Sequence, residues 1–200
     1  MFSVCHISIK KNEMLCLYYI YYCQKVKCCI DATMNSILQK HKMDWSEKIK
    51  NKPKLRTYRL YKCDFSAEKY LYLNLPKWKR SILAQFRLGI LPLNIETGRY
   101  KVIKDSAGNY RKQKPEERLC TLCSTNATED EIHFLLDCPC YDPIRQDLFN
   151  SVTLKNENFL NLPKLEQFKY LMESCANLVA KYLCTSWDKR KHMLYNNAET

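Results

Sequence analysis

Apolar residues recur at helical spacing along much of the chain, and the clearest case begins at Pro76. Its apolar positions recur every four residues, with one further position beside them: Trp78, Ile82, Leu83, Phe86 and Ile90. Such a stripe is typical of a helix that packs one face against a core. Proline suits the first turn of a helix, while Gly89 and Pro92 bracket its end. The pattern therefore predicts a helix that starts at Pro76 and ends near Gly89.

Two longer helices are predicted on either side of this one. Residues 32–50 predict a helix that Asp31 caps and Pro53 stops. Its apolar side would consist of Met34, Ile37, Leu38 and Trp45. Residues 163–187 predict a long amphipathic helix, whose apolar face would consist of Leu165, Phe168, Met172, Cys175, Val179 and Tyr182. A face of this kind belongs to a core or contacts a partner helix, so a protein partner at the C-terminal helix is possible.

Two shorter patterns complete the picture. Residues 98–114 predict two short strands around a turn at Ser106–Asn109. The apolar run Met14–Cys23 is too short to span a bilayer, and no membrane partner is predicted. A signal-like segment, a buried strand and an extension that does not pack remain open for this run.

The charge and the cysteines narrow the class of function. Lysine and arginine total 33 against 21 acidic residues, a formal charge of +12 that favours a polyanionic partner, most often nucleic acid. The twelve cysteines are mostly scattered, which favours a reducing compartment, nuclear or cytoplasmic, over a secreted disulfide framework. Only three glycines occur, and no Asp-Asp pair, so neither a phosphate-binding loop nor a two-metal polymerase site is expected. We therefore expect no enzymatic activity and no small-molecule substrate.

One stretch has the spacing of a metal site. Cys120 and Cys123 form a Cys-x2-Cys pair, and His133 and Cys138 supply a second pair ten residues after Cys123. Three sulfurs and one imidazole describe a structural, tetrahedral zinc site with no open position. Cys140 is an alternative fourth ligand, although Cys138 is preferred because a thiolate beyond Pro139 would need a further turn. Buried cysteines around a core histidine are the other interpretation.

A helix is expected to carry the histidine of this site. Thr128 and Glu131 stand in capping-box relation, and three acidic residues fall in the first turn, where the helix dipole favours them. The predicted fold class is therefore mostly α with a small β-hairpin, a helical domain that carries a CCHC zinc knuckle and a long C-terminal amphipathic helix. The predicted segments are an N-terminal extension, a helical basic region, the zinc module, and a connector with the C-terminal helix: 1–30, 31–118, 119–150 and 151–200.

A second candidate site is basic. The stretch Lys48–Lys62 holds seven positive charges and no acidic residue. Pro53 cannot continue a helix, so an extended strand from about Lys52 is predicted, with the charges along one edge. The predicted nucleic-acid contacts include two residues that precede the knuckle: Lys48, Lys50, Lys52, Lys54, Arg56, Arg59, Arg111 and Lys112. A solvated basic loop or a nuclear import signal is an equal alternative.

Residues 45–149 resemble the C-terminal tail of reverse transcriptases from non-LTR (LINE-type) retrotransposons. The resemblance rests on "LAQFRLGILPLNIETGRY" and on "EERLCTLCSTNATEDEIHFLLDCPCYDPIRQDLF". It implies that Cys120, Cys123, His133 and Cys138 bind zinc and that the tail helps to hold nucleic acid. The polymerase and endonuclease motifs of that family are missing here, so the resemblance implies a tail without its catalytic domain.

These observations predict a nucleic-acid-binding zinc module that contacts RNA or single-stranded DNA. The competing hypotheses are a structural zinc scaffold for protein–protein interaction and a non-functional fragment of a decayed element. The salt dependence of binding distinguishes the nucleic-acid module from the protein scaffold. Phosphate contacts weaken steeply as ionic strength rises, whereas an apolar interface does not.

Overall fold

The computed structural model describes the backbone of residues 3–196 and the side chains of residues 18, 19 and 21–196. Contacts divide the chain into two units between Ile49 and Lys50. The first unit is essentially one helix, α1, whose bounds are Ser3–Asn51. The second unit contains the other elements and the core described below.

Helix α1 begins well before the predicted start at Asp31, which lies in its interior. Neither glycine nor proline occurs between Ser3 and Asn51, so nothing local interrupts the helix before Pro53. The apolar run that could have been a strand is therefore helical. The predicted apolar side is exposed at Met34 and Ile37, so these side chains do not join a core. Within the described residues, none of the helices combines the length and the apolar character that crossing a bilayer requires.

The second unit is mostly helical and contains one small antiparallel hairpin, as predicted. Its helices and strands are α2 Tyr58–Tyr61, α3 Lys77–Leu88, α4 Asn94–Thr97, β1 Val102–Lys104, β2 Tyr110–Lys112, α5 Asp142–Thr153, α6 Lys164–Ser174 and α7 Ala176–Asn196. Short 3-10 turns connect several of them. A π-helical turn, His133–Asp137, precedes α5.

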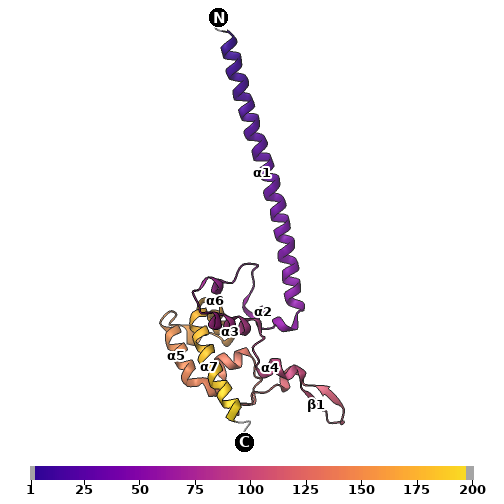
Figure 1. The fold of residues 1–200 in the computed structure, drawn as a ribbon, viewed down its shortest axis with the longest axis vertical. Coiled ribbons are helices and arrows are strands. Elements are labelled where there is room, and N and C mark those ends of the chain that lie inside the picture. The colour runs from indigo at the N-terminus through magenta and orange to yellow at the C-terminus, as the bar shows by residue number, and fades with distance from the viewer. Residues whose placement is uncertain (1–2, 197–200) are drawn as a thin grey trace. The chain divides into compact units, whose positions relative to one another are not determined.

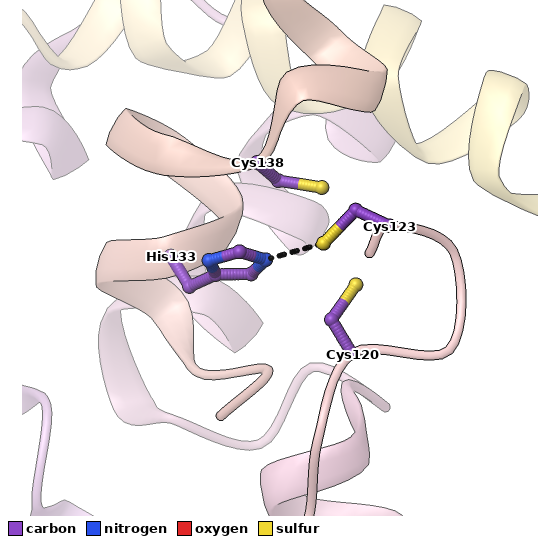
Figure 2. Close-up of side chains that lie close together, drawn as sticks. All are labelled: Cys120, Cys123, His133 and Cys138. Carbon is purple, nitrogen blue, oxygen red and sulfur yellow. Dashed lines mark hydrogen bonds between the residues drawn. The ribbon is translucent and has the colours of Figure 1, made fainter. Parts of the chain in front are cut away.

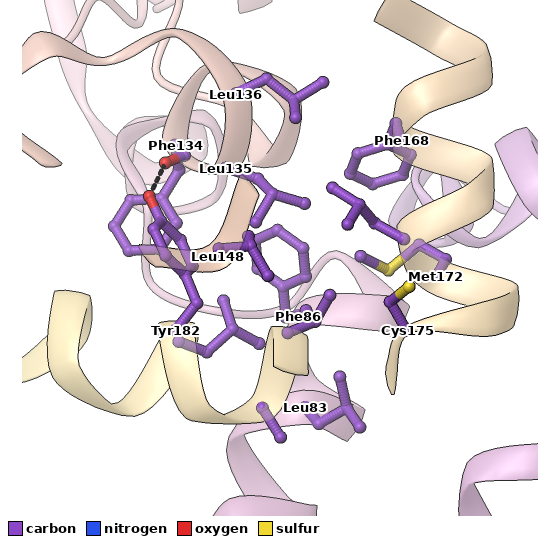
Figure 3. Packing of buried hydrophobic residues seen from close by; sticks show 14 of the residues in the cluster. Leu83, Phe86, Phe134, Leu135, Leu136, Leu148, Phe168, Met172, Cys175 and Tyr182 are labelled. Carbon is purple, nitrogen blue, oxygen red and sulfur yellow. Dashed lines mark hydrogen bonds between the residues drawn. The ribbon is translucent and has the colours of Figure 1, made fainter. Parts of the chain in front are cut away.

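The core lies where α3 and α5 pack against α7 and where α6 packs beside α7 (Figure 1). The rings of Phe86, Phe134 and Phe168 are fully buried and meet at centroid distances of 6.2 and 6.3 Å. The hydroxyl of Tyr182 donates to the carbonyl of Phe134 at 2.7 Å, so its one polar atom is satisfied inside the core (Figure 3). These rings come from all three predicted segments after residue 30, which therefore share one core.

Helix α3 agrees with the sequence prediction. Pro76 is its N-cap residue, and Gly89 ends it with a left-handed φ of 69°. Leu83 and Phe86 are fully buried, whereas Trp78 at the start of the predicted stripe is 59% exposed. Periodicity therefore located the helix and its central core residues, while its first apolar position lies outside the core.

The predicted C-terminal helix is in fact two helices. Helix α6 ends at Ser174, and Cys175 interrupts the helical backbone with φ −120° and ψ 25° before α7 begins. The predicted apolar face is buried except at Leu165, which is 41% exposed. Side chains three or four positions apart share a face in one helix or in two, so periodicity alone does not reveal the break. This face therefore belongs to the unit's own core, which is the first of the two environments predicted for it.

The hairpin is formed as predicted. Strands β1 and β2 pair with Ile103 opposite Arg111. In the turn, the Asp105 carboxylate accepts hydrogen bonds from the backbone N–H groups of Ala107 and Asn109. Gly108 adopts a φ of 82°, a left-handed conformation that glycine enters without steric cost.

The two left-handed glycines provide a matched test of the fold. Replacement of Gly89 by alanine would place a Cβ atom 2.9 Å from the hydroxyl of Thr57, whereas a Cβ at Gly108 meets no heavy atom within 4 Å. Each substitution should cost ~1–2 kcal/mol of unfolding free energy through the left-handed backbone. Gly89→Ala should cost more, because Thr57 must also move. Thermal unfolding of the two variants measures the difference; equal losses would contradict the close packing at Gly89.

Candidate metal centre

A short loop carries the first two predicted ligands. Its ends are held together by an isolated antiparallel bridge between Leu119 and Thr128 and by a hydrogen bond from the Cys120 N–H to the Ala127 carbonyl at 2.8 Å. Asn126 turns the loop with a left-handed φ of 53°. Asparagine tolerates this conformation better than most residues. The loop therefore returns the chain to the start of the turn that carries His133.

The other two ligands lie at the two ends of a π-helical turn. The N–H of Cys138 donates to the carbonyl of His133 at 2.8 Å, five residues earlier. In an α-helix, residues five apart point about 140° away from each other. In the wider π turn, residue i+5 lies nearly over residue i. The side chains of His133 and Cys138 can therefore point toward the same metal ion. Single π turns of this kind are often found at functional sites.

The four side chains point toward one another (Figure 2). One ligand atom from each residue lies within 4.8 Å of all the others. The Cys123 sulfur and the Nε2 atom of His133 lie 3.4 Å apart, within hydrogen-bonding distance. Cys120, His133 and Cys138 are buried, and Cys123 is half-buried. These four residues could hold a metal ion.

The structure separates the two candidates for the fourth ligand. The sulfur of Cys140 donates to the Leu122 carbonyl at 2.9 Å, and Cys140 is not part of the four-residue cluster. Cys138 is fully buried and faces the other three ligands. The geometry therefore favours Cys138, as the spacing argument does.

The side chains of the cluster shift one another's pKa values. A hydrogen bond from Cys138 lowers the pKa of the Cys120 thiol to about 3 and raises the pKa of Cys138. For His133, burial opposes the charged form, but hydrogen bonds to the sulfurs of Cys120 and Cys123 and their negative charge favour it and raise the pKa. The cluster thus favours a thiolate, the form in which cysteine binds metal.

The acidic residues that open the turn do more than favour the helix dipole, and the predicted capping box is wrong. Asp130, rather than Thr128, accepts the backbone N–H of His133, at 2.8 Å. The Glu131 carboxylate is buried and accepts hydrogen bonds from the Thr57 hydroxyl at 2.8 Å and from Arg56 at 2.6 Å. Glu131 therefore binds a segment 74 residues earlier in the chain, and a local sequence rule cannot show this.

Glu129 makes a second long-range connection. Its carboxylate forms a buried ion pair with Arg190 of α7 and accepts the backbone N–H of Asn94 at 2.8 Å. One of its oxygens also lies 3.8 Å from the sulfur of Cys120. The turn that carries His133 is thus bound to α4 and α7 as well as to the candidate metal loop.

Arg145 supports the far end of the same turn. Its guanidinium donates to the Leu135 carbonyl at 2.9 Å and to the Cys138 carbonyl at 2.6 Å. Carbonyls in the last turn of a helix have no N–H donor within that helix. The Arg145 guanidinium supplies the missing donors here. Sequence reasoning missed Arg145 and Arg190, because nothing in their local pattern distinguishes them from solvent-facing arginines.

The predicted basic strand is not extended. Lys52 has an extended backbone, but Pro53 starts a 3-10 turn, Pro53–Leu55, and α2 follows, so the chain becomes extended again only at Lys62. Proline pre-sets the φ angle of a first helical turn, and this preference prevails over the extended alternative. The side chains therefore do not form the straight row that alternation predicts.

The eight predicted nucleic-acid contacts fall into two groups. The arginines are engaged within the protein: Arg56 binds Glu131 and Glu96, Arg59 donates to the Lys50 carbonyl at 2.6 Å, and Arg111 binds Glu117 through both terminal nitrogens. The lysines are exposed, and none forms an ion pair within the described part of the chain: Lys48, Lys50, Lys52, Lys54 and Lys112.

Serine substitution tests the assignment of the fourth ligand. Cys138→Ser should abolish stoichiometric metal binding, because it removes one of four converging sulfur or nitrogen ligands. Cys140→Ser should leave the stoichiometry unchanged, because it loses only a weak hydrogen bond to a carbonyl. Elemental analysis of the purified variants measures both. Metal loss in the Cys140 variant alone would exchange the roles of the two residues.

Substitution of Arg56 tests its ion pair with Glu131, which connects the turn that carries His133 to the stretch Lys48–Lys62. Arg56→Gln should lower the free energy of unfolding by about 2 kcal/mol, because it leaves the buried Glu131 carboxylate with the Thr57 hydroxyl as its only side-chain donor. Arg59→Gln makes the same change of charge at an exposed site and should cost no more than ~0.5 kcal/mol. Denaturant unfolding compares the two, and equal effects would show that the Arg56–Glu131 pair adds nothing.

Comparison with known proteins gives no match among family models, curated proteins or solved structures. The similarity of residues 45–149 to a retrotransposon reverse-transcriptase tail therefore rests on the motifs alone and remains a prediction.

Proposed function

We propose that the four-residue cluster is a structural zinc site. Three sulfurs and one imidazole nitrogen suit Zn²⁺, whereas Mg²⁺ and Ca²⁺ prefer oxygen ligands. Four protein ligands fill a tetrahedral shell and leave no position for substrate or water. The convergence of the ligand atoms within 4.8 Å is the observation that carries this proposal.

The zinc ion would then act by holding separate parts of the chain together. It joins the Cys120–Cys123 loop to the π turn, and the acids at the start of that turn bind α7 and the segment around Arg56. Structural zinc sites contribute on the order of 10–16 kcal/mol of apparent binding energy. We therefore propose that the fold around this site depends on the ion, and that the protein acts in a nuclear or cytoplasmic compartment where thiols stay reduced.

We further propose that the second unit is a nucleic-acid-binding module without catalytic activity of its own. The support is the formal charge of +12 on the whole chain, the stretch Lys48–Lys62 without a single acid, and the exposure of Lys50, Lys52 and Lys54 within it. Ammonium groups that lack ion-pair partners can contact phosphates without first breaking a bond inside the protein. The resemblance to a retrotransposon tail supports the same partner. Primer extension by the purified protein would contradict the absence of catalysis.

A salt titration with two charge-matched variants tests nucleic-acid binding. The test variant carries Lys50→Gln, Lys52→Gln and Lys54→Gln. The control carries the same substitutions at three exposed lysines of the helical body: Lys155, Lys164 and Lys181. With single-stranded DNA or RNA, each lost phosphate contact should reduce the slope of log affinity against log salt by about 0.7. The test variant should therefore lose roughly two units of slope and the control little.

The opposite outcomes are equally specific. If both variants bind like the wild type, the lysines are a solvated surface. If both lose slope equally, binding reflects net charge alone. Binding of a protein partner with an affinity that is independent of salt would instead favour the scaffold function.

A further inference from the structure

The hairpin presents one face that the rest of the unit leaves uncovered. In its register, Val102 pairs with Lys112 and Lys104 pairs with Tyr110, and all four side chains are exposed. The other face, with Ile103 opposite Arg111, is half-buried. The hairpin extends away from the helical body of the unit (Figure 1). The exposed face is therefore open to a ligand.

The arm formed by residues 98–114 carries two strongly exposed tyrosines. Tyr110 is 74% exposed, and Tyr100, which lies just before β1, is 72% exposed. The ammonium of Lys104 lies 5.3 Å from the centroid of the Tyr110 ring and orients the ring by a cation–π contact. Aromatic rings this exposed, with a cation beside them, provide flat surfaces on which other rings can stack.

The charge of the arm favours an anion. Residues 98–114 contain six basic residues and a single acid, Asp105. The Asp105 carboxylate accepts hydrogen bonds from the backbone N–H groups of the turn, and its single charge offsets only one of the six cations. Neither Lys104 nor Lys112 forms an ion pair within residues 18–196. The exposed face thus combines stacking surfaces with uncompensated positive charge.

The base of the arm is rigidly held. Arg111 and Glu117 form a two-contact ion pair at 2.8 and 2.5 Å, and the side-chain amide of Gln113 donates to the Glu117 carbonyl at 2.7 Å. Arg118 donates to the Ile95 carbonyl at 2.7 Å and so connects this base to the helical body. A held base fixes the direction in which the open face points and reduces the entropy lost on binding.

We propose that this face binds an unpaired stretch of nucleic acid, with Tyr110 stacking on a base and Lys104 and Lys112 contacting phosphates. The inference rests on the proposed nucleic-acid function and adds that bases, as well as phosphates, contribute to affinity. In a duplex the base faces are covered by their neighbours, so stacking requires a single strand. A protein partner would need a larger apolar surface, and the face offers only one aliphatic side chain, Val102.

The test compares two oligonucleotides of equal length and charge, one of deoxythymidine and one without bases. The wild type should bind the base-bearing strand at least about five-fold more tightly, since stacking on one aromatic side chain contributes that much. Tyr110→Ala should remove most of this preference and leave binding to the abasic strand unchanged. Tyr110→Phe keeps the ring and should retain the preference. Tyr72→Ala removes a tyrosine that is 80% exposed outside the hairpin and should also retain it.

The failures are distinguishable. No binding to either strand would overturn the proposed function and the inference with it. Equal affinity of the wild type for the two strands would leave phosphate binding intact and overturn the stacking role of the hairpin. Loss of the preference in Tyr72→Ala, with Tyr110→Ala unchanged, would assign stacking to another surface and also overturn the inference.

Discussion

The second unit depends on one constraint: three thiols and an imidazole meet in a largely buried pocket within 4.8 Å. Thiolates in such a pocket repel one another and are poorly solvated unless a cation lies between them. A zinc ion would resolve that conflict and fix the loop at Cys120 against the π turn. The acids at the start of the turn extend the constraint, because Glu131 binds Arg56 and Glu129 binds Arg190. Segments far apart in sequence are therefore organised around one small site.

The distribution of cations follows the chemistry of the side chains. Arg56, Arg111 and Arg190 form close ion pairs with carboxylates, whereas lysines such as Lys52 and Lys112 remain exposed without ion pairs within the described residues. The planar guanidinium suits fixed, two-contact geometry, and the ammonium is a compact, strongly hydrated charge. Arginine thus serves the architecture, and lysine supplies the surface charge that the proposed nucleic-acid contacts require.

Local spacing predicted the parts of this molecule that local forces determine. Helix α3 between Pro76 and Gly89, the hairpin and the convergence of the four ligands were predictable, because capping, turn chemistry and ligand spacing act over a few residues. Long-range contacts were not predictable. The role of Glu131 depends on Thr57, and the role of Arg190 depends on a residue 61 positions away. The 3-10 turn at Pro53 and the break at Cys175 are choices between local conformations that the sequence pattern fits equally well.

X-ray absorption at the zinc edge of the purified protein would identify the atoms that bind the ion. We expect one zinc per chain with a first shell of three sulfurs at about 2.3 Å and one nitrogen at about 2.0–2.1 Å. Removal of the ion by a chelator should then abolish cooperative unfolding of the region around the site. A protein purified under reducing conditions that contains no stoichiometric metal would contradict the proposed zinc site. A first shell made only of nitrogen and oxygen would contradict it equally.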